Sequence, residues 1–178
     1  MRIASFDVGI KNLAVCVMDG ALDIQDWRII PLVAKDDKVR NAYFQELADK
    51  VYASLDDCLG TWGRVDHVLI ENQPVMKNPS MKTIQMLIFG FFQGARMGGR
   101  VGEIHLLSAR GKLCVDNVVL CDHLKSAYAN AKKSSVLTAR DYLKSKGKWL
   151  ATLDSSKKKD DLSDSFLQGV YFVQRCLP

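Results

Sequence analysis

A dense group of carboxylates stands near the end of the sequence. Asp160, Asp161 and Asp164 open an apolar stretch in which Leu162 and Phe166 recur at helical spacing. At 3.6 residues per turn, Asp161 and Asp164 share one face of such a helix, and Asp160 lies one turn before Asp164. Like charges this close repel one another unless a cation binds between them. The cluster therefore indicates a cation site, although carboxylates are also common in a first helical turn, where they complement the dipole.

Two further carboxylates close predicted strands. Asp7 ends an apolar run that begins at residue 2, and Glu71 ends one that begins at residue 65. Taken singly, each is compatible with a turn residue or a solvated strand end. Carboxylates from the ends of neighbouring strands can, however, converge with a helix terminus, and magnesium prefers such oxygen ligands. Two ions about 3.5–4 Å apart can activate a water and stabilise the leaving oxygen of a phosphodiester. The joint placement predicts this chemistry.

Alternating strand and helix patterns must position these carboxylates. The first two strand-like runs flank a turn at Val8-Gly9, which predicts an antiparallel hairpin, and later strands are joined through helices. This order predicts an α/β fold with a mixed five-stranded sheet, its first three strands antiparallel, flanked by helices. Residues 108–131 are expected to form a loop-rich excursion and 147–156 a linker. The expected strands are 2–7, 13–18, 22–32, 65–70 and 101–107, and the expected helices 36–59, 80–97, 134–146 and 160–175.

Length and composition predict one domain, 1–178, since 178 residues suffice for a single core. The longest apolar run, 86–92, is too short to cross a bilayer, and no signal peptide is expected, so we predict an intracellular protein outside membranes. Five cysteines contain no C-x-x-C pair, and His67, His105 and His123 lack H-x-x-x-H spacing. We therefore expect neither a disulfide framework nor a zinc knuckle, and we interpret the histidines as structural.

Charge is distributed unevenly along the chain. Residues 1–71 carry 8 Lys and Arg against 12 Asp and Glu, whereas residues 72–159 carry 16 against 5. A basic stretch bordered by carboxylates suits a protein that holds a phosphate backbone near a metal centre, although lysine-rich surfaces are common in other proteins. The helix predicted at 80–97 is apolar over so wide a surface that it serves either the core or a subunit interface.

Four segments together resemble a known family. The segments are 7–14 (DVGIKNLA), 70–74 (IENQP), 128–136 (YANAKKSSV) and 159–166 (KDDLSDSF). In this order they resemble the poxvirus-type Holliday junction resolvases of large DNA viruses, which belong with RuvC and the fungal mitochondrial resolvases in the ribonuclease H-like superfamily. The sequence departs from many of these relatives at Asn72, where they carry a basic residue, and its 108–131 segment is longer.

The resemblance implies a viral, ribonuclease H-like homodimer that cuts four-way DNA junctions symmetrically in the host cytoplasm. It implies two Mg²⁺ ions per active site, for which Mn²⁺ can substitute. The acidic ligands carried over are Asp7, Glu71, Asp161 and Asp164, with Asp160 as a competitor for Asp161. The residues expected to contact DNA are Lys11, Gln73, Lys77, Lys82, Lys132 and Lys133.

Two other functions remain compatible with the sequence. One is a ribonuclease H-like nuclease acting on RNA:DNA hybrids or flaps, and the other is a junction-binding module without catalysis. A sugar-kinase or actin-like ATPase, whose fold also begins with an Asp-x-Gly hairpin, needs a second phosphate-binding lobe for which 178 residues leave no room.

Overall fold

The structure is a computed structural model, and it describes residues 1–32, 44–76 and 79–177. Within these residues the centre is a five-stranded sheet of order β3-β2-β1-β4-β5. The β1–β2 and β2–β3 pairs are antiparallel, whereas β1–β4 and β4–β5 are parallel. The predicted mixed sheet, with its first three strands antiparallel, is therefore confirmed. The strands are β1 (Arg2–Asp7), β2 (Asn12–Asp19), β3 (Ile24–Pro31), β4 (Val65–Glu71) and β5 (Val101–Leu107).

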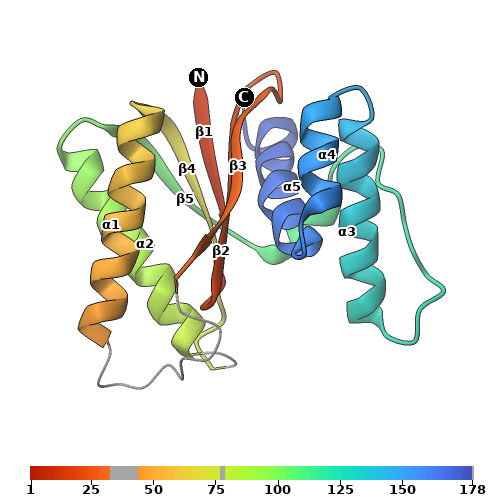
Figure 1. Cartoon of the computed structure of the whole chain (residues 1–178), viewed down its shortest axis with the longest axis horizontal. Coiled ribbons are helices and arrows are strands. Elements are labelled where there is room, and N and C mark those ends of the chain that lie inside the picture. The colour runs from red at the N-terminus through yellow and green to blue at the C-terminus, as the bar shows by residue number, and fades with distance from the viewer. Residues whose placement is uncertain (33–43, 77–78, 178) are drawn as a thin grey trace.

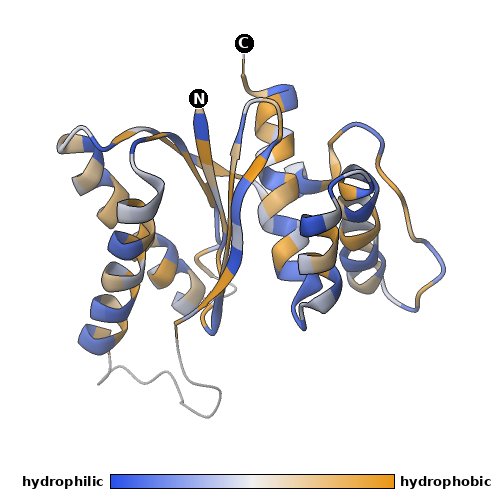
Figure 2. Cartoon of the chain, turned by 45° about the horizontal axis from the view of Figure 1, so that its top comes forward, coloured by the Kyte–Doolittle hydropathy of each residue, from blue (hydrophilic) through white to orange (hydrophobic). Residues whose placement is uncertain are grey.

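Helices cover both faces of this sheet (Figure 1). On one face lie α1 (Phe44–Trp62) and α2 (Pro79–Met97). On the other face α5 (Lys159–Arg175) packs directly on β1 and β2, and α3 (Ala127–Leu143) and α4 (Gly147–Ser155) pack against α5. Figure 2 shows hydrophobic residues along the strands and hydrophilic residues on the sides of the helices that face away from the sheet. This distribution fits the two buried cores, one on each face of the sheet.

The central strands are buried on both faces. In β1 the alternating side chains of Ala4 and Phe6 enter the core beneath α1 and α2, while Ile3 enters the core beneath α5. This explains why β1 and β2 are near-continuous apolar runs rather than alternating ones, since both of their faces are covered by helices.

Gly169 allows α5 to approach the sheet closely. A Cβ atom at this position would lie 2.5 Å from Met18 Cε and 3.7 Å from Ser5 Cβ. The neighbouring Gln168 amide donates to Ser5 Oγ at 3.1 Å and to the Phe6 carbonyl at 3.2 Å. These contacts fix α5 against β1, the strand that ends at Asp7.

Helix boundaries differ from the predictions in several places. Residues 33–43, which contain the predicted start of the 36–59 helix, lie outside the described residues, and the helix continues beyond residue 59 to Trp62. It ends before Gly63, whose positive φ of 70° is the left-handed conformation that commonly ends helices. The predicted strand 22–32 is shorter in the structure because Leu22, with a φ of 64°, belongs to the turn before β3.

The predictions for 108–156 were partly wrong. The excursion at 108–131 contains a 3-10 helix, η2 (Ala109–Leu113), and α3 begins seven residues before the predicted 134, where the Ser126 side chain caps it by accepting from the Ala129 amide. The predicted linker 147–156 is instead largely the helix α4, whose Leu153 is fully buried against the α5 core. Burial of this side chain outweighs the weak local pattern around Gly147.

The α2 helix fills the core with Ile84, Ile88 and Phe92, so of its two predicted roles the core role is confirmed. In the described part of the chain, no helix has both the length and the apolar character needed to span a membrane.

Candidate active site

The strand-end carboxylates lie side by side at one edge of the sheet. Asp7 is the last residue of β1 and Glu71 the last residue of β4. These strands are parallel neighbours in which Phe6 pairs with Ile70, so the next residue of each strand projects from the same edge. Asp164 reaches this edge from the second turn of α5, and the Ser135 hydroxyl of α3 donates to its carboxylate.

The centre of this group is Lys112, which the sequence did not indicate. Its Nζ lies 2.5 Å from Asp7 Oδ1, 3.1 Å from Glu71 Oε2 and 3.2 Å from Asp164 Oδ2. The residue is only 6% exposed. It comes from η2, which packs so tightly on α5 that a Cβ at Gly111 would lie 2.8 Å from the Tyr171 ring. No hydrophobic period in the sequence marks a single lysine in an irregular segment. The packing of η2 on α5 is what places Lys112 among the carboxylates.

Burial dominates the electrostatics of the cluster. It raises the pKa of Asp7 to about 7, with Lys112 opposing and Glu71 reinforcing the shift. Burial likewise raises the pKa of Asp164, again opposed by Lys112. Burial alone would lower the pKa of Lys112, but the charges of Asp7, Asp164 and Glu71 raise it above its usual value. The lysine is therefore a cation held by carboxylates that are costly to ionise without it.

The structure separates the two aspartates that open α5. Asp161 lines the same cavity as Asp7 and Asp164, and burial, with the charges of Asp160 and Asp7, raises its pKa. Asp160 is not among the lining residues and forms an ion pair with Lys132, whose hydrogen bond and charge outweigh partial burial and lower the pKa of Asp160. All four predicted acidic residues thus share one cavity, and Asp160 faces a lysine of α3.

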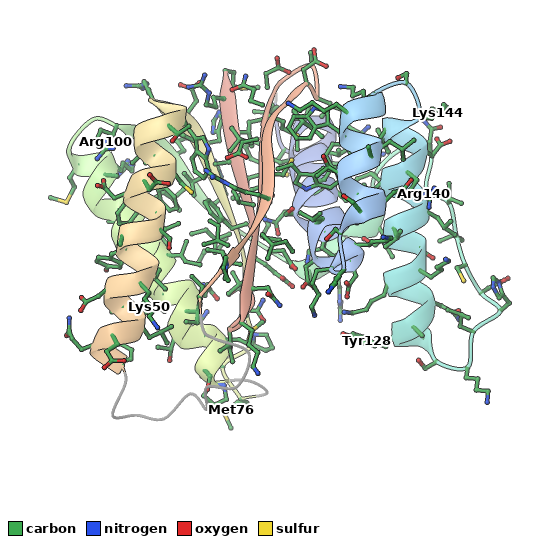
Figure 3. All side chains as sticks on the ribbon, in the orientation of Figure 1. Lys50, Met76, Arg100, Tyr128, Arg140 and Lys144 are labelled. Carbon is green, nitrogen blue, oxygen red and sulfur yellow. The ribbon has the colours of Figure 1, made fainter. Side chains whose placement is uncertain are left out.

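This cavity has a volume of about 520 Å³ and a basic wall. In Figure 3, Tyr128 marks the lower end of α3, on the side of the molecule where β1 and β4 end, and it is one of the lining residues. Carboxylates and lysines therefore meet in one hollow. The lining lysines are Lys11, Lys112, Lys132 and Lys158.

The residues predicted to contact DNA fall into three groups. Lys11, Gln73 and Lys132 line the cavity. Lys82 does not line it, and its Nζ donates to Asn72 Oδ1 at 3.1 Å and to Gln85 Oε1 at 3.0 Å. Lys133 is exposed on α3, outside the cavity lining. Lys77 lies outside the described residues.

The donor set fits a magnesium ion. The four carboxylates supply only oxygen, the ligand type that Mg²⁺ prefers, and Asp7, Glu71 and Asp164 already share one cation in the Lys112 ammonium. The ammonium stands in for an ion that these three carboxylates can hold together.

Sequence comparison gives limited information. No protein-family model matches the chain. The chain is 30% identical over 121 residues to the uncharacterized protein L451 of Acanthamoeba polyphaga mimivirus, a match that covers 62% of this chain and 29% of that protein. The match thus spans less than a third of the length of this curated relative.

Solved structures show a clear likeness of fold. The yeast mitochondrial Holliday junction resolvase Ydc2 gives a TM-score of 0.69 at 15% identity, with 97% of this chain and 78% of that chain covered. Thermus thermophilus RuvC in complex with a Holliday junction substrate gives 0.62 at 14%, covering 98% and 95%. The fowlpox virus Holliday junction resolvase gives 0.58 at 19%, covering 99% and 100%. At these identities the likeness concerns the fold.

Proposed function

The chain has the RuvC-like fold of Holliday junction resolvases, and from this premise we propose that it is a magnesium-dependent endonuclease that cuts four-way DNA junctions. One observation carries the proposal. At the sheet edge, the carboxylates of Asp7, Glu71 and Asp164 converge on one cation in a cavity walled by lysines. A binding module without catalysis would have no need to bury mutually repelling carboxylates.

We assign Asp7, Glu71, Asp161 and Asp164 as the ligands of two Mg²⁺ ions, for which Mn²⁺ can substitute. Bound magnesium supplies Lewis acidity for hydrolysis of a phosphodiester. Before metal binds, the Lys112 ammonium balances the carboxylates, and a raised pKa keeps a proton on Asp7 to near neutral pH. The Ser135 hydroxyl holds the Asp164 carboxylate in its orientation.

The lysines of the cavity wall are assigned to the DNA backbone. Lys11, Lys132 and Lys158 surround the carboxylates, and Lys132 is held by Asp160 with its Nζ 5.1 Å from the centre of the Tyr128 ring. Cationic side chains set around an acidic centre can hold the flanking phosphates while the scissile phosphate enters it. This arrangement separates backbone binding from cutting.

Symmetrical cutting requires two active sites, so we propose a homodimer with one site for each of two related strands. The helix α2 is the candidate interface, because its outer side exposes Met86 and Met97 while its inner side fills the core.

The test is a cleavage assay of Glu71→Gln on a mobile four-way junction with Mg²⁺. We expect cutting to be lost, because one ligand is removed, while junction binding survives through the lysines. The matched control is Glu46→Gln, since Glu46 is exposed on α1. Full cutting by Glu71→Gln would refute the metal assignment. Preference of the wild type for an RNA:DNA hybrid over the junction would refute the substrate assignment.

A further inference from the structure

A second group of metal-binding side chains lies on β4 and β5, away from the acidic cavity. His67 pairs with Glu103 across these parallel strands, and His105 follows Glu103 by two residues. Because side chains alternate along a strand, all three project from one face, the face covered by α5. His67 and Glu71 stand four residues apart on β4, so about 13 Å separates this group from the acidic cavity.

The distances within this group match those between ligands of one metal ion. His67 Nδ1 lies 3.2 Å from His105 Nε2, and Glu103 Oε2 lies 3.5 Å from His105 Nε2 and 3.9 Å from His67 Nδ1. Tetrahedral zinc with bonds of about 2.0–2.2 Å places neighbouring ligand atoms about 3.3–3.6 Å apart. The three atoms therefore already form one face of such a tetrahedron to within a few tenths of an ångström.

We propose that His67, Glu103 and His105 form a binding site for a divalent transition-metal ion, and that the ion is Zn²⁺. Two imidazoles and a carboxylate are a zinc-binding set that leaves the fourth position to water. Imidazole nitrogen selects zinc, copper or nickel over magnesium, whereas the all-oxygen acidic cavity selects magnesium. The two sites are thus distinguished by chemistry as well as by distance.

An aromatic ring and partial burial surround the two imidazoles. The Phe172 ring of α5 lies over both histidines, with ring centres 5.2 Å from His67 and 4.7 Å from His105. Within the described residues, the ionisable side chains that interact with either imidazole are those of the cluster itself. Burial and the His67 charge lower the pKa of His105, against the opposing Glu103, which favours the neutral ring that binds metal.

An ion can reach the site from solvent. The Glu103 side chain is 69% exposed, and the His67 and His105 side chains are 19% and 27% exposed. A bound ion would join β4 to β5 beneath α5. Since β4 carries Glu71 and α5 carries Asp164, zinc would stabilise the framework of the acidic cavity without taking part in its chemistry.

The test is a calorimetric titration of the whole protein with Zn²⁺ in saturating Mg²⁺, which occupies the acidic cavity. We expect one zinc equivalent in the wild type and its loss in His105→Gln. In Glu103→Gln we expect the zinc affinity to be at least about tenfold weaker. Loss of a residue that only hydrogen-bonds to a metal ligand already costs about tenfold, and Glu103 is proposed to bind the ion directly. Because Glu103 is exposed, this variant keeps its fold, which circular dichroism will verify.

The control is His123→Gln, whose histidine lies beside Cys121, with Nδ1 3.7 Å from the sulfur. It should keep the zinc equivalent, and the Co²⁺-loaded wild type should show tetrahedral absorption without a sulfur-to-metal charge-transfer band. Zinc should also raise the unfolding temperature of the wild type and of His123→Gln, but not of His105→Gln. Unchanged zinc binding in both His105→Gln and Glu103→Gln, or loss of the equivalent in His123→Gln, would overturn the proposal.

Discussion

Replacing Lys112 with methionine removes the ammonium that links three buried carboxylates while keeping most of the side-chain volume. The side chains of Lys112, Asp7 and Glu71 are 8%, 14% and 13% exposed, so water screens their charges little. Breaking a buried ion pair by removing one partner costs about 3–5 kcal/mol. For a chain of this size each kcal/mol lowers the unfolding temperature by about 2–4 °C. We therefore expect Lys112→Met to unfold roughly 6–20 °C below the wild type in EDTA at pH 8.

Two further effects separate electrostatics from packing. At pH 5.5 the loss should be smaller, because Asp7, with a pKa of about 7, then carries a proton that relieves part of the repulsion. Mg²⁺ should bind Lys112→Met more tightly than the wild type, because no ammonium competes for the carboxylates, and it should restore most of the lost stability.

Thermal unfolding in EDTA and in a series of Mg²⁺ concentrations measures all three effects. The matched control is Lys133→Met, an exposed lysine of α3, which should unfold like the wild type. An unfolding temperature of Lys112→Met equal to that of the wild type in EDTA at pH 8 would refute the charge-balance reasoning. Weaker Mg²⁺ binding by this variant would show that the ammonium assists the ion rather than competing with it.

Three other predictions follow from the same structure. The folded-state pKa of Asp7, about 7, lies above its ordinary 3.8, so below pH 7 Asp7 must lose a proton to bind metal. The Mg²⁺ affinity measured by calorimetry should therefore rise by about tenfold per pH unit up to pH 7 and then level. A Mg²⁺ affinity that does not change with pH would contradict the assignment of Asp7 as a ligand. Lys132→Met should weaken junction binding and reduce the slope of log Kd against log salt by about 1 in fluorescence anisotropy, whereas Asp160→Asn, which frees the lysine, should not weaken it. Gly169→Leu should lower the free energy of unfolding, measured by urea denaturation, by about 1–3 kcal/mol or more, because Met18 fills the space that a Cβ would enter. A free energy of unfolding equal to that of the wild type would show that α5 can shift outward.

Local patterns in the sequence were sufficient for most of the sheet and for the carboxylates at its edge. The apolar runs that end at Asp7 and Glu71 are strands because both of their faces are buried, and residue 101 begins the fifth strand as predicted. Helical spacing likewise placed Asp161 and Asp164 together at the start of α5. These features depend on the period of neighbouring residues, which a single sequence displays.

Local patterns failed where burial overrides a weak period. The helix α4 begins at a glycine and has only nine residues, so its apolar side chains, Trp149, Leu150 and Leu153, span too few turns to display a clear helical period. The helix α3 begins at Ala127 because Ser126 caps it, although few apolar residues follow in the first turns.

Contacts between distant segments were decided by tertiary structure alone. Lys112 reaches Asp7, 105 residues earlier, only because η2 packs on α5, and His67 meets His105 only through the register of β4 with β5. The sequence by itself determined the five strands, most of the helices, and that carboxylates close two strands and open a helix, because those properties repeat over a few residues. The tertiary structure decided that a lysine neutralises those carboxylates, that Asp160 turns to Lys132, and that two histidines face one glutamate, because strand register and helix packing depend on the whole core.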